Sequence, residues 1–142
     1  MKKWFCIIVV FMLGTSLTEK ETKHFSINPQ PVQEVNAKPD KQNDYSARIV
    51  NNTDTDLIVK WKVTENTLLK GWDYSICNYG QCLAGIPKSG SMRPIKKGDK
   101  GFLNLHINPM NVKGTGSVSF YVFEEGHENE GETITYIVRV KK

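Results

Sequence analysis

From residue 45 onward, apolar and polar side chains alternate in short runs. The clearest run spans residues 57–63, where every odd position is apolar and Lys60 and Lys62 fall on the opposite side. This period of two is typical of a β-strand with one buried face. Similar runs span residues 47–51, 72–76, 103–107, 118–122 and 134–140, separated by turn-forming residues. No window of eleven residues shows a convincing helical period.

Six or seven short strands over about 95 residues predict an antiparallel β-sandwich of the immunoglobulin-like kind. A β-barrel is the alternative architecture. The side chains predicted to face the core are Ile49, Leu57, Val59, Trp61, Val63, Leu103, Leu105, Ile107, Val118, Phe120, Val122, Ile134, Tyr136 and Val138. Burial of each contributes roughly 1.5–3 kcal/mol, so we expect a core that needs no cofactor or metal.

The chain before residue 45 lacks this alternating pattern of apolar and polar residues. Residues 1–16 begin with two lysines, continue with ten apolar residues and end with small residues, which predicts a cleaved signal peptide. The apolar run is about half the length of a membrane-spanning helix, so a retained anchor is the less favoured alternative. Residues 17–44 are polar and contain three prolines, which predicts a flexible segment, with a short strand near residues 25–27 as a weaker alternative. Residues 45–142 then form the sandwich.

The predicted cleavage determines which cysteines remain in the mature chain. Cys6 lies in the predicted leader, so the mature chain retains Cys77 and Cys82. An exported compartment favours disulfides, and we expect these two residues to form one that stabilises a short loop. Redox-active pairs usually have two intervening residues at a helix N-terminus, whereas here four residues intervene on β-structure. A periplasmic thiol–disulfide or metal-carrier protein using Cys77 and Cys82 is the alternative function.

Other reactive residues form no recognised pattern. His24, His106 and His127 lie far apart, and none has a ligand-like partner at short spacing, so no metal site is predicted. The acidic run at residues 124–130 lacks the ordered oxygen ligands of a calcium loop and predicts a solvated hairpin tip. There is no Gly-x-Ser-x-Gly motif, and residues 89–91 indicate a flexible loop. We expect no catalytic residues, no cofactor and no enzymatic activity.

Binding is the remaining possibility. The full chain has a formal charge of +4, which falls to +2 without Lys2 and Lys3, so no nucleic-acid partner is expected. Aromatic and basic side chains could form a contact surface for a protein, or less favourably for an anionic glycan. These residues are Trp72, Tyr74, Tyr79, Lys60, Lys62, Arg93, Lys96 and Lys97. The interpretation that we favour is that Trp72 packs in the core against the disulfide and that the lysines protect strand edges.

A series of short motifs also carries a family resemblance. In order they are Asn51-Asn52-Thr53, Leu57-Ile58-Val59-Lys60-Trp61, Gly71-Trp72, the pair Cys77 and Cys82, Pro94 with Gly98-Asp99, Asn108-Pro109, and Gly114-Thr115-Gly116. This pattern resembles a small immunoglobulin-like domain of secreted and surface proteins of Bacteroidetes, which often precedes a sorting domain for type IX secretion. The resemblance implies a non-catalytic sandwich whose two cysteines form a disulfide.

The end of the sequence departs from that family pattern. The last predicted strand is followed directly by Lys141 and Lys142, without a sorting domain. We therefore expect an exported structural, accessory or adhesive protein in the periplasm, on the cell surface or outside the cell. Its expected partner is another envelope or secreted protein, and the mature chain is expected to contain no membrane span.

Overall fold

The computed structural model describes residues 23–141, and these residues form strands and connecting turns without a helix. The strands are β1 (Phe25–Asn28), β2 (Val32–Ala37), β3 (Asn43–Asn51), β4 (Val59–Asn66), β5 (Asp73–Asn78), β6 (Gln81–Ala84), β7 (Ser89–Ser91), β8 (Lys100–Asn108), β9 (Gly114–Glu124) and β10 (Glu132–Val140). The predicted signal peptide, residues 1–16, lies outside the described residues.

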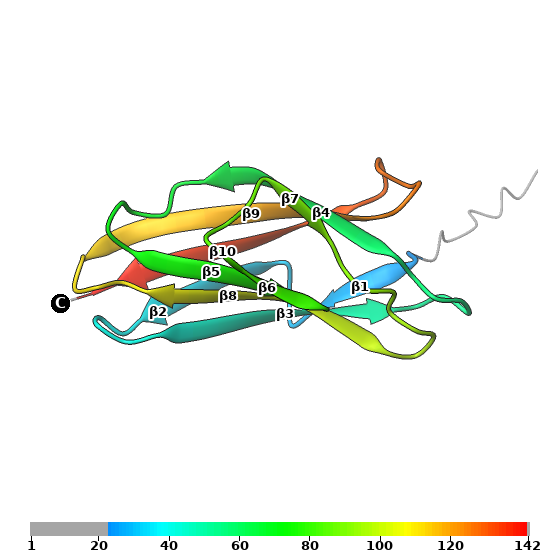
Figure 1. Ribbon diagram of the computed structural model, residues 1–142, viewed down its shortest axis with the longest axis horizontal. Helices are drawn as coiled ribbons and strands as arrows, with labels where there is room; N and C mark the ends of the chain where they lie inside the picture. The colour runs from blue at the N-terminus through cyan, green and yellow to red at the C-terminus, as the bar shows by residue number, and fades with distance from the viewer. Residues whose placement is uncertain (1–22, 142) are drawn as a thin grey trace, which may run out of the picture.

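The strands form two sheets of five, stacked face to face (Figure 1). Sheet A has the order β1-β3-β8-β5-β6, and sheet B has the order β2-β10-β9-β4-β7. The pairings are antiparallel, apart from the parallel pairing of β2 with β10. The predicted immunoglobulin-like β-sandwich is therefore confirmed, with ten strands in place of about seven.

The N-terminal part of the described chain differs from the prediction. A flexible segment was expected over residues 17–44, but β1 pairs with β3, and β2 pairs with β10. Phe25 and Ala37 are buried, so each strand contributes an anchor to the core. The sequence did not predict β2 because most of its residues are polar. Only alternate side chains of β2 face inward, and an edge strand can carry polar residues on its outer side. The weaker alternative of a strand near residues 25–27 is confirmed.

The core lies between the two sheets. The predicted inward side chains are all buried, except that Val63 is partly buried. Trp61 contacts Phe120 edge to face, with ring centroids 5.6 Å apart, and Phe120 contacts Tyr136 in the same way at 6.4 Å. The core also contains residues that were not among the predicted inward side chains. Ala47, Trp72, Ile76 and Val140 lie in the predicted alternating runs, whereas Phe25, Ala37, Met92 and Ile95 lie outside them.

Trp61 also explains the short strand β7. Residues 89–91 were expected to form a flexible loop, but they pair with β4, and Gly90 lies opposite Trp61. A Cβ atom at Gly90 would lie only 2.5 Å from Cζ2 of Trp61, which is closer than the sum of the two van der Waals radii and would be a steric clash. The glycine therefore provides the space that the indole occupies, and this packing requirement accounts for a residue that otherwise indicates flexibility.

A buried hydrogen bond joins the middles of the two sheets. Tyr136 on β10 of sheet B has no exposed surface, and its hydroxyl donates to the backbone carbonyl of Leu103 on β8 of sheet A, at 2.6 Å. Burial raises the pKa of the Tyr136 phenol above its ordinary value, so the hydroxyl keeps its proton and remains a donor. The bond satisfies the polar end of a large aromatic side chain inside an apolar core.

We expect Tyr136→Phe to lower the free energy of unfolding by about 1–2 kcal/mol, because it removes the donor from a buried hydrogen bond. Urea denaturation of the wild type and the variant measures this difference. Tyr79→Phe is the matched control, since the Tyr79 side chain is partly exposed to water. An equal loss in the two variants would contradict a special role for the Tyr136 bond.

Candidate functional site

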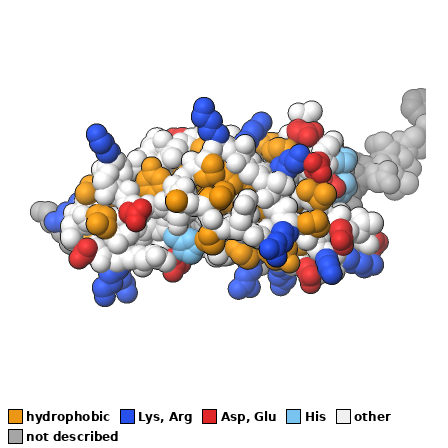
Figure 2. Space-filling model, in the orientation of Figure 1, with side chains coloured by type: hydrophobic (Ala, Val, Ile, Leu, Met, Phe, Trp, Pro, Cys, Tyr) orange, Lys and Arg blue, Asp and Glu red, His pale blue; other side chains and the backbone are white. Residues whose placement is uncertain are grey.

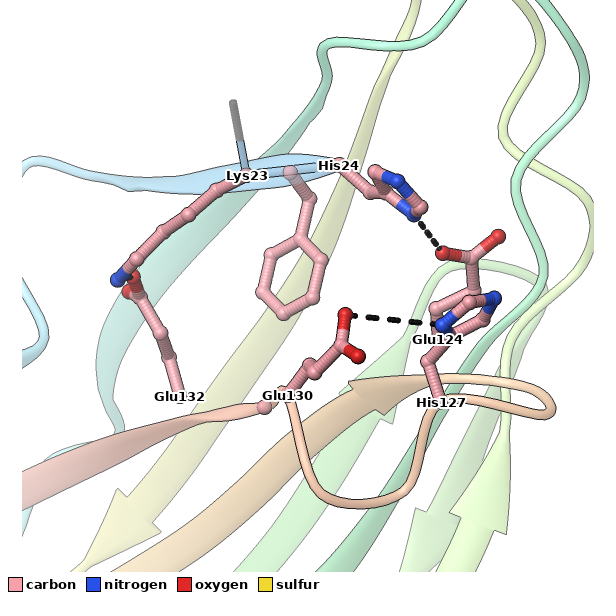
Figure 3. A pocket seen from close by; sticks show the side chains of 8 residues that line it. Lys23, His24, Glu124, His127, Glu130 and Glu132 are labelled. Carbon is pink, nitrogen blue, oxygen red and sulfur yellow. Dashed lines mark hydrogen bonds and ion pairs between the residues drawn. The ribbon is translucent and has the colours of Figure 1, made fainter. Parts of the chain in front are cut away.

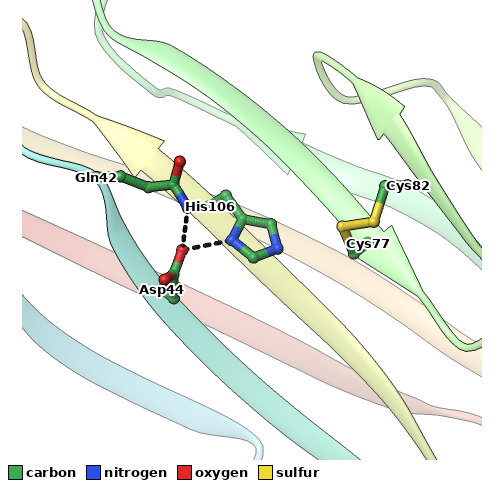
Figure 4. The surroundings of a disulfide bond; sticks show 5 residues. All are labelled: Gln42, Asp44, Cys77, Cys82 and His106. Atoms are coloured by element: carbon green, nitrogen blue, oxygen red, sulfur yellow. Dashed lines mark hydrogen bonds and ion pairs between the residues drawn. A yellow bond between two sulfur atoms is a disulfide. The ribbon is translucent and has the colours of Figure 1, made fainter.

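The two cysteines form the expected disulfide. Cys77 on β5 and Cys82 on β6 are register partners, with Cα atoms 4.0 Å apart, in a hairpin that turns at Tyr79 and Gly80 (Figure 4). Gly80 has a φ of +124°, a conformation that favours glycine, and a Cβ there would lie 2.6 Å from Cγ of Arg93. Arg93 therefore lies directly over the turn, and its backbone N–H donates to the carbonyl of Tyr79 at 2.8 Å.

The disulfide marks the outer face of sheet A. Cys77 pairs in register with Asn104, and Asn104 pairs with Ser46, so a continuous row of side chains crosses three strands. We define the disulfide face as the outward side chains of Arg48, Cys77, Tyr79, Cys82, Phe102 and Asn104, together with Arg93 over the turn. Figure 2 shows hydrophobic side chains near the middle of this side of the molecule, with Lys and Arg mostly along its margins.

An aromatic pair lies on the disulfide face. The rings of Tyr79 and Phe102 meet edge to face with centroids 5.8 Å apart, and both side chains are partly exposed, although Tyr79 also packs against the core on its inner side. Arg48 pairs in register with Phe102 and is exposed. Phe102 and Arg48 were not among the contact residues predicted from the sequence. Phe102 directly precedes the inward-facing Leu103, so the alternation places its aromatic ring on the outer face, and this position could have identified it as a contact residue.

The predicted contact residues do not form one surface. Trp72 is buried, and its indole N–H donates to the backbone carbonyl of Val112 at 2.8 Å, so Trp72 is a core residue and not part of a contact surface. Tyr74 is partly buried and packs against the core. Lys96 and Lys97 are exposed in the connection between β7 and β8, where Lys97 pairs with Asp54 at 2.6 Å. Only Tyr79 and Arg93 of the predicted set belong to the disulfide face.

Lys60 and Lys62 lie on the opposite side of the molecule, on the outer face of sheet B. The Glu125 carboxylate pairs with the Lys60 ammonium and raises the pKa of that lysine. The Lys62 ammonium lies 5.2 Å from the ring centroid of Tyr121, which stacks on Phe123. Lys62 therefore covers an aromatic pair on its own sheet, and neither lysine extends the disulfide face.

A polar network borders the disulfide face. His106 on β8 lies between Asp44 on β3 and Ser75 on β5, its register partners, and its Nδ1 atom contacts the Asp44 carboxylate (Figure 4). The Gln42 amide donates to the same carboxylate at 2.8 Å. The hydrogen bonds from His106 and then Gln42 lower the pKa of Asp44 below its ordinary value. The network fixes the orientation of the His106 ring on an open sheet surface.

The structure also brings together histidines that the sequence spacing kept apart. His24 immediately precedes β1, Glu124 ends β9, and His127 lies in the β9–β10 hairpin. Their potential ligand atoms all lie within 4.8 Å of one another (Figure 3). They line a pocket at one end of the sandwich, together with Lys23, Phe25, Glu130, Gly131 and Glu132. No local motif could have revealed this cluster, because the contact depends on the pairing of β1 and on the fold of the hairpin.

Solved structures with a similar fold are known. The N-terminal domain of PorA matches with a TM-score of 0.58 and 17% identity over 78% of this chain and 87% of that chain. A PapD-like domain of human CEP192 matches with a TM-score of 0.51 and 13% identity over 96% of this chain and 99% of that chain. Part of a family 123 glycoside hydrolase from Clostridium perfringens has a TM-score of 0.51 and 12% identity, over 79% of this chain and 23% of that chain. At these identities the likeness defines the fold alone.

Sequence comparison adds no further assignment. No protein-family model matches the chain, and no curated protein sequence matches it. Within residues 23–141, no helix has the length and apolar character needed to cross a membrane. The class that the fold defines is an immunoglobulin-like and PapD-like β-sandwich with one disulfide-linked hairpin.

We expect Asp44→Asn to reduce stability at neutral pH by no more than about 1 kcal/mol, because solvent screens this exposed network. A lowered pKa in the folded state stabilises the protein at pH values above the unfolded-state pKa, which is about 3.9. This contribution disappears as the pH falls through the lower folded-state pKa. The stability difference between wild type and variant should therefore shrink below about pH 4.

Thermal or urea unfolding from pH 7 to pH 2 measures this effect. His106→Gln removes the main cause of the pKa shift and should reproduce most of the change. The double variant should then lose less than the sum of the single variants, since both act on one contact. A pH-independent difference between wild type and Asp44→Asn would contradict the assignment.

Proposed function

We propose that this chain is an exported, non-catalytic immunoglobulin-like protein that binds another protein through its disulfide face. The observation that carries the proposal is the pair of partly exposed aromatic rings, Tyr79 and Phe102, between Arg48 and Arg93 on an open sheet surface. Within residues 23–141, no third layer of structure covers this surface. Tyr, Phe and Arg are enriched in protein interfaces because they combine a large apolar area with directional polar groups.

The charge of the disulfide face favours an acidic partner. Arg48 and Arg93 are exposed beside the aromatic pair, and Lys96 and Lys100 are exposed in and just after the connection that crosses the end of the sheet. Complementary charge increases the rate of association and sets orientation. The partner proposed here is therefore a protein of the envelope or the extracellular space that presents carboxylates around an apolar centre.

Export is supported by two independent features. The disulfide is typical of proteins that leave the reducing cytoplasm, and the sequence of residues 1–16 has the pattern of a signal peptide. The resemblance to domains of secreted Bacteroidetes proteins favours the same interpretation. The periplasm, the cell surface and the medium are all consistent with these features.

Photo-crosslinking tests the binding face directly. A photoreactive phenylalanine analogue at position 102, in the protein expressed in its source cells, should give a discrete crosslinked protein under ultraviolet light. The same analogue at exposed Lys113 is the control and should give none. Arg48→Glu should weaken the crosslink at position 102. Equal crosslinking at the two positions, or an unchanged yield in Arg48→Glu, would overturn the proposed face.

The disulfide should act as a structural link in this function. We expect replacement of Cys77 and Cys82 by serine to cost about 2 kcal/mol of stability, because a short loop lies at the low end of the usual range. The variant should keep the crosslink at position 102 under conditions in which it remains folded. A reduction potential above about −250 mV for the wild-type disulfide would instead favour the thiol–disulfide alternative.

A further inference from the structure

The pocket at the end of the sandwich combines residues that are ordinary metal ligands. We propose that His24, Glu124 and His127 bind a divalent transition-metal ion, with Zn²⁺ as the ion that fits this donor set. Two imidazoles and a carboxylate are a common zinc-binding set, whereas Ca²⁺ and Mg²⁺ are bound through oxygen atoms. This inference does not depend on the proposed binding face, which lies on the outer surface of sheet A.

The spacing of the side chains fits one small ion. The potential ligand atoms of the three residues lie within 4.8 Å of one another. In a tetrahedral zinc site each ligand lies about 2.0–2.2 Å from the ion, so neighbouring ligand atoms are separated by less than 4 Å. Small side-chain rotations therefore suffice to reach this geometry. The rings of His24 and His127 already meet edge to face, with centroids 5.3 Å apart (Figure 3).

The backbone holds the ligands from both sides of the pocket. The carbonyl of His24 accepts the backbone N–H of Asn52 at 2.9 Å, and the next residue, Phe25, is anchored in the core. On the other side, the N–H of His127 donates to the carbonyl of Glu124 at 3.0 Å. The ligands are therefore positioned before an ion arrives, which reduces the entropy lost on binding.

A tyrosine stabilises the hairpin that carries His127. The hydroxyl of Tyr121 donates to the carbonyl of Glu128 at 3.0 Å and accepts the N–H of Gly131 at 2.9 Å. These two bonds tie the far side of the hairpin to β9. The hairpin is thus a defined turn and not a loose acidic loop.

The charges around the pocket favour a cation. Lysines pair with two flanking glutamates, Lys23 with Glu132 and Lys60 with Glu125. The carboxylates of Glu124 and Glu130 meet histidine rings instead, and Glu130 lies 3.6 Å from Nδ1 of His127. Glu130 is placed to hydrogen-bond a ligating imidazole or to supply the fourth ligand. Zinc would neutralise these carboxylates and link the start of β1 in sheet A to the β9–β10 hairpin of sheet B.

Calorimetric titration of the purified, untagged protein with zinc chloride tests the site. We expect saturable binding of one ion per chain and a rise in melting temperature that EDTA reverses. Loss of an outer-shell partner typically weakens zinc binding by about tenfold or more, so His24→Ala and His127→Ala should each weaken it at least that much. His106→Ala is the matched control, because His106 also contacts a single carboxylate but has no second histidine beside it.

Nuclear magnetic resonance separates loss of the site from loss of the fold. In wild-type protein, zinc should shift the imidazole signals of His24 and His127 and leave those of His106 unchanged. The metal-free variants should keep the amide spectrum of the folded sandwich outside the pocket. Absence of saturable binding, retention of full affinity in the His24→Ala/His127→Ala double variant, or equal shifts at His106 would each overturn the proposal.

Discussion

The structure depends on the burial of one layer of side chains between two sheets. Trp61, Phe120 and Tyr136 form the large aromatic centre of this layer, and small or branched residues fill the space around them. The hydrophobic effect supplies the stability, but it has no direction and does not align one sheet with the other. Direction between the sheets comes from the Tyr136 hydroxyl, which donates to the Leu103 carbonyl of the opposite sheet. Within sheet B, Gly90 leaves the space that the Trp61 indole occupies.

Much of this fold could be predicted because the alternation of apolar and polar residues within a sandwich strand shows which of its faces is buried. The alternation in residues 103–107 and 118–122 assigns the apolar side chains to the core, and the structure agrees, although Ser119 on the opposite side of its strand is also buried. The strands β2 and β7 could not be recognised in the same way. The first is a polar edge strand whose order comes from pairing with β10, and the second is defined by the packing of Gly90 against Trp61. Both strands form because of contacts with residues distant in the sequence, and the local sequence of each does not predict a strand.

The same distinction applies to the sites. The disulfide could be predicted, because Cys77 and Cys82 lie close in the chain and the third cysteine, Cys6, falls in the predicted signal peptide. The predicted contact surface was only partly coherent, since sequence proximity placed Trp72 beside Tyr79 although the fold sends one inward and the other to the surface. The cluster of His24 with His127 could not be predicted at all. These residues are near opposite ends of the described chain, and only the closed sandwich brings them together.

The pairing of β2 with β10 has a consequence for the way the protein is made. Val32 pairs with Thr135, and Ala37 pairs with Val140, so one edge of sheet B joins the beginning of the folded chain to its end. During synthesis β2 emerges early, but its hydrogen-bonding partner β10 is the last of the described strands to emerge. Until then the inward side chains of β2 have no sheet to pack on, and contacts of such long sequence separation form slowly. The sandwich therefore closes only after β10 has been synthesised, and until then the unpaired edge of β2 is open to unwanted strand pairing.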